Sequence, residues 1–155
     1  MRKIAGILLL TLAVSACSLG LSPTLLPNHV RQRTSVDCLL ASLATLGGWT
    51  YEQAETARIA AGITYHDGLD PSEAVTIAAR LGKRLQIDYT PNPVQEDGIF
   101  VAKWGDPSLS VAGHHAVYLQ DGWVYDPSQD QPQPWVLWLT EMPGTHFVYV
   151  IREAN

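Results

Sequence analysis

The sequence predicts an α+β fold in which N-terminal helices pack on an antiparallel sheet formed by the C-terminal half of the chain. Helical spacing of apolar residues and helix-capping signals occur before Lys83, and short runs of β-branched and aromatic residues, separated by Pro and Gly, follow it. Helices first and strands afterwards is the order typical of an α+β domain. The chain has 155 residues, of which 46% are hydrophobic and 16% charged, and this composition fits one folded domain with its own core.

Each of the three predicted helices has its own start or stop signal. In the first, leucines recur at helical spacing until Gly47-Gly48 ends the helix. The second opens with a capping box formed by Thr50 and Gln53, and the third opens with Asp70 followed by a proline. The three helices are predicted over residues 35–46, 50–61 and 70–81.

Five strands are predicted, and one hairpin fixes a register. The strands cover residues 85–89, 98–103, 115–119, 123–125 and 147–151. Asp121-Gly122 is a two-residue type I′ turn signal, so Gln120 is expected to pair with Trp123. Counting away from this turn places His115 and Asp126 on one face as diagonal neighbours, within reach of an imidazole–carboxylate hydrogen bond.

Other residues near this hairpin have less specific expectations. His114 is expected to point to the opposite face of the sheet from His115. Residues 129–135 are expected to form an exposed loop, and Trp138 is expected to be core or rim packing. Residues 65–68, between the second and third helices, either cap the third helix or border a cleft.

The first 16 residues are predicted to be a lipoprotein signal peptide. Arg2 and Lys3 form a basic start, and the apolar run over residues 4–14 is shorter than the roughly 20 residues that cross a bilayer. Small residues then precede Cys17, which resembles the lipobox of bacterial lipoproteins. The resemblance implies that Cys17 is lipidated, and Ser18 after it implies the periplasmic face of the outer membrane. An ordinary signal peptide is the alternative.

The domain boundaries follow from this leader. Residues 17–30 are expected to be the lipidated cysteine and a tether, and residues 31–155 the folded domain. Cys38 is then the one thiol of the domain, with no partner for an intramolecular disulfide. Such a cysteine is either an apolar filler or a reactive thiol, and the start of a helix favours its thiolate form.

A cysteine at a helix start opposite a His–Asp pair on a sheet is the arrangement of papain-like thiol hydrolases. Residues 32–41, Q-R-T-S-V-D-C-L-L-A, resemble the Q-x4-D-C-x-x-A motif of the bacteriocin-processing cysteine peptidases, which cut double-glycine leader peptides. His115-Ala116-Val117 and Asp126-Pro127 resemble the segments that carry the family's histidine and aspartate. His146-Phe147-Val148 resembles the histidine segment too, but no Asp follows it.

The resemblance implies a catalytic triad of Cys38, His115 and Asp126. It also implies an oxyanion hole formed by the Gln32 side chain and the backbone N–H of Cys38. The reaction implied is hydrolysis of a peptide bond through an acyl-enzyme, with a peptide or protein as substrate and without a metal or an organic cofactor. Leu39 departs from the small residue that the family usually has after the cysteine.

Two other functions remain open from the sequence. One is a catalytically inactive peptide-binding lipoprotein of the same fold, and Leu39 is the feature that favours it. The other is an amidase or transpeptidase acting on cell-wall peptides, which a location in the cell envelope makes plausible. Nucleic-acid binding is not expected, because the net charge is −5 and no run of Lys or Arg occurs.

Overall fold

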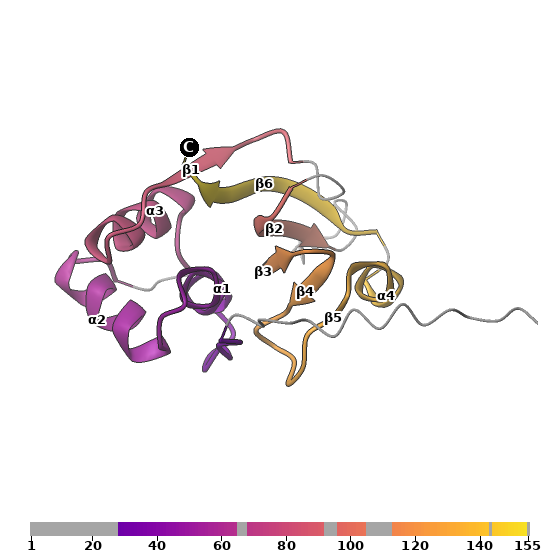
Figure 1. Cartoon of the computed structure of the whole chain (residues 1–155), viewed down its shortest axis with the longest axis horizontal. Coiled ribbons are helices and arrows are strands. Elements are labelled where there is room, and N and C mark those ends of the chain that lie inside the picture. The colour runs from indigo at the N-terminus through magenta and orange to yellow at the C-terminus, as the bar shows by residue number, and fades with distance from the viewer. Residues whose placement is uncertain (1–27, 65–67, 92–95, 105–112, 143, 155) are drawn as a thin grey trace, which may run out of the picture.

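The computed structural model describes residues 28–64, 68–91, 96–104, 113–142 and 144–154 (Figure 1). The described helices are α1 (Cys38–Gly47), α2 (Tyr51–Ala60), α3 (Pro71–Arg80) and α4 (Trp135–Glu141). The strands are β1 (Leu85–Asp88), β2 (Gly98–Trp104), β3 (Gly113–Gln120), β4 (Trp123–Tyr125), β5 (Gln133–Pro134) and β6 (His146–Glu153). They form one antiparallel sheet in the order β1-β6-β2-β3-β4-β5, so the predicted α+β class is confirmed.

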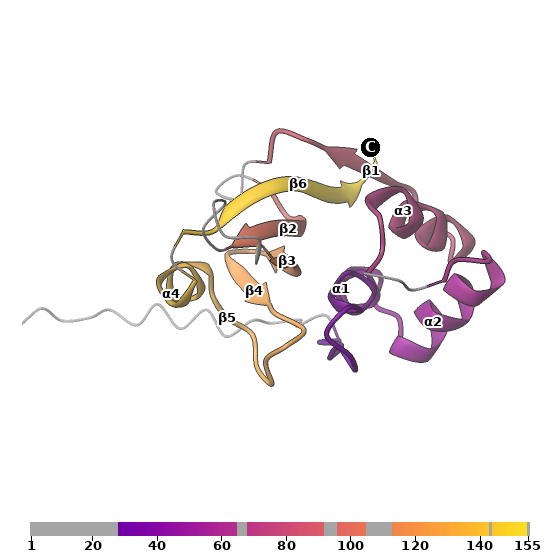
Figure 2. The ribbon, with the colours of Figure 1, turned by 180° about the vertical axis from the view of Figure 1, so that it is seen from behind.

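The sheet carries helices on both faces (Figures 1 and 2). Helices α1 to α3 cover one face, on which Val101 and Ala116 are buried among apolar residues of those helices. Helix α4 covers the other face, where Phe100 and Val117 pack with Trp138. Because neighbouring strand residues point to opposite faces, β2 and β3 each contribute to both halves of the core.

All three predicted helices are present, and the capping box predicted for α2 is formed. Helix α3 also opens with a capping box, between Asp70 and Glu73. Helix α1 begins at Cys38 and not at residue 35, because the preceding segment is held in a turn. The buried Asp37 carboxylate accepts hydrogen bonds from the backbone N–H groups of Arg33 and Thr34, at 3.0 and 3.1 Å. A side chain that bonds nearby backbone groups in this way competes with helix formation, so α1 begins only after Asp37.

The predicted hairpin register is confirmed. Gln120 pairs with Trp123, and both turn residues, Asp121 and Gly122, have positive φ (50° and 77°), as a type I′ turn requires. Counted away from the turn, the last paired residues of the two strands are Tyr118 and Tyr125. Asp126 therefore lies just beyond the last paired residue of β4, on the side of the sheet that its place in the register predicts.

The expectation of an exposed loop over residues 129–135 is wrong at its C-terminal end. Gln133 and Pro134 pair with β4 as β5, and Trp135 begins α4. The sequence lacks the usual signals here, because the N-cap position is Pro134 and no side chain caps the helix. Helix α4 is stabilised by tertiary packing, since Trp138 is fully buried against the sheet and Trp135 stacks on it.

Two residues at the end of the predicted tether contact the folded domain. His29 and Val30 belong to the folded domain: Val30 is buried, and its backbone N–H donates to Thr45 Oγ1 at 3.0 Å. The His29 ring bonds the backbone oxygen of Asp126 at 2.9 Å. The predicted signal peptide and Cys17 lie outside the described residues. Within the described ranges, none of the helices has the length and apolar character needed to cross a bilayer.

Replacing Thr45 by Val tests whether Val30 is fixed to the domain. Thr45 Oγ1 accepts from Val30 and donates to the backbone oxygen of Ala41 at 3.0 Å. The variant leaves a buried N–H without an acceptor, so the free energy of unfolding in urea should fall by about 1–3 kcal/mol. Thr76→Val is the matched control, because exposed Thr76 makes the same kind of bond, to Ser72, and should change stability by less than about 0.5 kcal/mol. Equal effects in the two variants would contradict the assignment.

Candidate active site

The start of α1 positions Cys38 at the surface of the domain. Cys38 is the first residue of the helix and is partly exposed, whereas Asp37 before it is fully buried. Besides the two backbone groups described above, the Asp37 carboxylate accepts from the Tyr51 hydroxyl at 2.5 Å. Asp37 is therefore bonded both to the loop before α1 and to α2, and Cys38 is the residue that follows it. Sequence reasoning quoted Asp37 only as part of a motif and missed this role.

His115 and Asp126 form a buried pair on the sheet. His115 Nε2 lies 2.8 Å from Asp126 Oδ1, and the two side chains are 9% and 4% exposed. This is the imidazole–carboxylate hydrogen bond that the hairpin register predicts, and it is confirmed. Cys38 lies close enough to His115 to interact with it electrostatically, and the two side chains line one small cavity.

Three further donors hold the Asp126 carboxylate, and sequence reasoning missed them. The backbone N–H and the hydroxyl of Ser128 donate to Oδ1 at 2.8 and 2.6 Å. The indole N–H of Trp138 donates to Oδ2 at 2.9 Å. An Asp side chain that bonds the backbone two residues further on is a common turn device, so the bond to Ser128 is the one that a sequence signal could have indicated. No signal in the sequence brings Trp138 to this site, because α4 itself was not predicted.

These contacts set the protonation states of the pair. Burial alone lowers the pKa of His115, but its hydrogen bonds and charge interactions with Asp126 and Cys38 outweigh that effect and raise the pKa to about 9. Burial alone raises the pKa of Asp126, but the bond and charge of His115, with the bonds from Ser128 and Trp138, lower it well below its usual range. At neutral pH the pair is therefore an imidazolium and a carboxylate.

Cys38 and His115 share the wall of a small cavity of about 70 Å³. Leu39 lines the same cavity and is buried, so the departure from the family motif lies directly beside the thiol. Gly68 also lines it, so the segment over residues 65–68 borders a cleft at its last residue. His66 and the rest of that segment lie outside the described residues.

Gln32 lies close to the Asp126 segment. Its backbone N–H donates to the oxygen of Pro127 at 2.9 Å, and its side-chain Oε1 is buried without a hydrogen-bond partner in the structure. The described wall of the Cys38 cavity does not include Gln32. The structure thus brings Cys38, His115 and Asp126 together and holds the Gln32 backbone beside them.

The other histidines are placed elsewhere. His114, the neighbour of His115 on β3, is exposed and also lines the Cys38 cavity. His146 is exposed at the start of β6. Among the side chains that the structure describes, no group of three or more His, Cys, Asp or Glu residues is arranged to hold a metal ion.

Comparisons with known proteins add a likeness in overall structure. No family model matches the sequence, and no curated protein matches it significantly. A similar solved structure is the peptidase domain of Streptococcus ComA, described as a bifunctional ABC transporter involved in a quorum-sensing pathway. The two chains are 18% identical with a TM-score of 0.49, over 81% of this chain and 96% of that one.

The pH dependence of stability tests the buried pair. Because the pKa of His115 rises from 6.5 to about 9, its stabilising contribution is complete below pH 6.5 and is lost as the pH rises through 9. Between these pH values the wild type should lose more unfolding free energy than Asp126→Asn, which lacks the contribution of the carboxylate to the shift; the whole shift, including the contribution of Cys38, corresponds to about 3 kcal/mol. Urea unfolding of both proteins at several pH values measures this difference. Parallel stability profiles would contradict the pairing.

A second test addresses the bond between Trp138 and Asp126. Trp138→Phe keeps an aromatic ring but removes the N–H donor to Asp126 Oδ2. The free energy of unfolding at neutral pH should therefore fall by about 1–3 kcal/mol. Trp135→Phe is the control, because Trp135 stacks on Trp138 without a described bond to Asp126. The excess cost of Trp138→Phe should shrink in acid, where Asp126 takes up a proton. A cost that is equal in both variants at every pH would mean that Trp138 acts only through packing.

Proposed function

We propose that this protein is a cysteine peptidase that hydrolyses a peptide bond with Cys38, His115 and Asp126. The observation that carries the proposal is geometric: Cys38, at the start of α1, shares a cavity wall with His115, and His115 is bonded to the buried Asp126 carboxylate at 2.8 Å. A nucleophile, a base and a group that orients the base are the parts that acyl transfer by a thiol requires. The bacteriocin-processing peptidases, which residues 32–41 resemble, use such a set of residues.

In this mechanism Cys38 attacks the peptide carbonyl as a thiolate, and the negative charge moves to the carbonyl oxygen. His115 is charged at neutral pH because its pKa is raised to about 9, so it is able to protonate the leaving amine. Water then attacks the thioester and loses a proton to His115, and the C–S bond breaks to release the carboxylic acid and the Cys38 thiolate. Asp126 bonds Nε2 throughout, which leaves Nδ1 as the ring nitrogen that exchanges protons in this mechanism.

The oxyanion hole is proposed to use the backbone N–H of Cys38 and the side-chain amide of Gln32. As the first residue of α1, Cys38 has a backbone N–H without an acceptor inside the helix. The Gln32 backbone is bonded to Pro127. The side chain must therefore rotate for its amide to reach the substrate. One such donor contributes about 3–4 kcal/mol to transition-state stabilisation in comparable sites.

The proposed location is the cell envelope, with the domain attached to the periplasmic face of the outer membrane through a lipidated Cys17. This rests on the order of basic, apolar and small residues that ends at Cys17. In this setting the substrate is a peptide or protein of the envelope.

One observation favours a second candidate function, a peptide-binding protein without turnover. Leu39 lines the Cys38 cavity, whose volume of about 70 Å³ leaves little room beside the thiol. A substrate backbone that binds there without placing its carbonyl against the sulfur would be retained and not cleaved. Cleavage of a peptide library that disappears in Cys38→Ser would exclude this candidate.

The rate at which iodoacetamide alkylates Cys38 tests the proposal directly. If His115 supports a thiolate, alkylation stays fast well below pH 8.5, where an ordinary thiol has largely lost its reactive form. His115→Ala should slow the reaction about 100-fold at pH 6–7. His146→Ala should react like the wild type, since His146 is exposed and is not among the residues that line the Cys38 cavity. A wild-type rate that rises only near pH 8.5, with no effect of His115→Ala, would refute the proposed function.

A further inference from the structure

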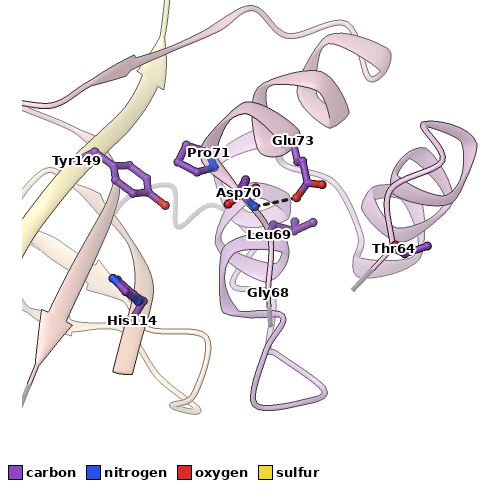
Figure 3. Close-up of a pocket in the computed structure, with 8 residues that line it drawn as sticks. All are labelled: Thr64, Gly68, Leu69, Asp70, Pro71, Glu73, His114 and Tyr149. Atoms are coloured by element: carbon purple, nitrogen blue, oxygen red, sulfur yellow. Dashed lines mark hydrogen bonds between the residues drawn. The ribbon is translucent and has the colours of Figure 1, made fainter. Parts of the chain in front are cut away.

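A second, larger cavity of about 430 Å³ adjoins the one that contains Cys38 (Figure 3). Four residues line both cavities: Gly68, Leu69, His114 and Tyr149. A group bound in the larger cavity is therefore next to a substrate held at the thiol. The proposed mechanism uses none of these four residues.

The two sides of this cavity differ in chemistry. Tyr149 and His114 come from the sheet, and Figure 3 shows the Tyr149 hydroxyl directed toward the start of α3. The opposite side is the N-terminal end of α3 with the segment before it, where Asp70 and Glu73 contribute carboxylates. Leu69 and Pro71 next to them add apolar surface.

The two carboxylates are fixed in position before any ligand binds. Glu73 Oε2 accepts the backbone N–H of Asp70 at 2.8 Å, and the Asp70 side chain in turn caps the N–H of Glu73. A carboxylate has about four acceptor positions, so one cap bond leaves each group able to accept more. A ligand that uses them pays little for ordering these side chains.

Their charge is not neutralised within the described parts of the chain. Neither Asp70 nor Glu73 forms a salt bridge with a described residue, and no Lys or Arg is among the described residues of the cavity wall. The positive end of the α3 dipole amounts to about half an elementary charge, so two carboxylates exceed it. The side of the cavity formed by α3 is therefore anionic.

Tyr149 stands between the thiol and this anionic side. It lines both cavities, and burial together with the nearby Cys38 and Asp70 raises the pKa of its phenol above the usual range. The hydroxyl thus stays protonated and is able to donate a hydrogen bond to a substrate carbonyl. The negative charge that a bound cation requires comes from the carboxylates on the other side.

We propose that the larger cavity binds a substrate side chain that ends in a cation, as in lysine or arginine, near the bond that Cys38 attacks. Its aliphatic part lies along Leu69 and Pro71, and its charged end is paired with Asp70 and Glu73. This inference rests on the proposed function and names the substrate class for the same site. The specificity follows from anchoring a long, cationic side chain in a cavity continuous with the nucleophile.

Peptidyl chloromethyl ketones test the inference, because Cys38 displaces their chloride and the thioether is counted by mass spectrometry. Three alanine-based probes carry one lysine at the first, second or third residue from the reactive group, and three matched probes carry uncharged norleucine there. For at least one of the three positions, the lysine probe should react at least about fivefold faster than its norleucine match at low salt. This preference should decrease at high salt.

Asp70→Asn/Glu73→Gln removes both charges and keeps residue types that support a capping box, so α3 should still form. In this variant the lysine-to-norleucine ratio should fall close to one. The control, Asp121→Asn/Glu141→Gln, removes two charges from a turn and from α4 and should keep the wild-type ratio. A ratio that falls equally in both variants would show only a general effect of net charge and would overturn the inference.

The same proteins separate failure of the inference from failure of the proposed function. If Cys38 of the wild type shows the His115-dependent reaction with iodoacetamide but no lysine probe exceeds its norleucine match, the cationic subsite is wrong and the peptidase proposal stands. If the iodoacetamide reaction does not depend on His115, the proposed function itself fails.

Discussion

The buried carboxylate of Asp126 is the constraint on which the rest of the site depends. It accepts hydrogen bonds from β3 through His115, from its own turn through Ser128 and from α4 through Trp138. Its backbone oxygen binds His29 as well. An unpaired charge at such a depth costs several kcal/mol, so these segments must meet there for the domain to be stable. Stability and the orientation of His115 therefore have the same cause.

The thiol and the imidazole come from different layers of the fold, and a few bonds fix their relative position. Ser42 of α1 donates to the backbone oxygen of Ala116 at 3.0 Å, next to His115 on β3. Before α1, Gln32 is bonded to Pro127, directly after Asp126. Asp37 then fixes the last turn before Cys38. The helix start is thus aligned with the His–Asp pair by buried bonds on both sides of the cysteine.

The capping box of α3 illustrates how one local device serves two purposes. In the sequence, Asp70 and Glu73 signal a helix start, and in the structure they do cap it. Because the sheet places Tyr149 and His114 across a cavity from them, the same carboxylates become the anionic side of a space that continues to Cys38. At a buried helix end, the acceptor atoms of the cap residues would be bonded or covered by other side chains. Asp70 is exposed, so its carboxylate is accessible to a ligand.

The sequence by itself determined the local features: three helices, five of the six described strands, and a hairpin whose turn type places His115 and Asp126 side by side. These follow from short-range spacing and turn chemistry, which a single chain displays directly. Only the tertiary structure decided that α4 exists, that Trp138 binds Asp126 and that His29 belongs to the domain. Helix α4 has no capping signal and is stabilised by burial against the sheet, so its partners are set by contacts between residues distant in sequence.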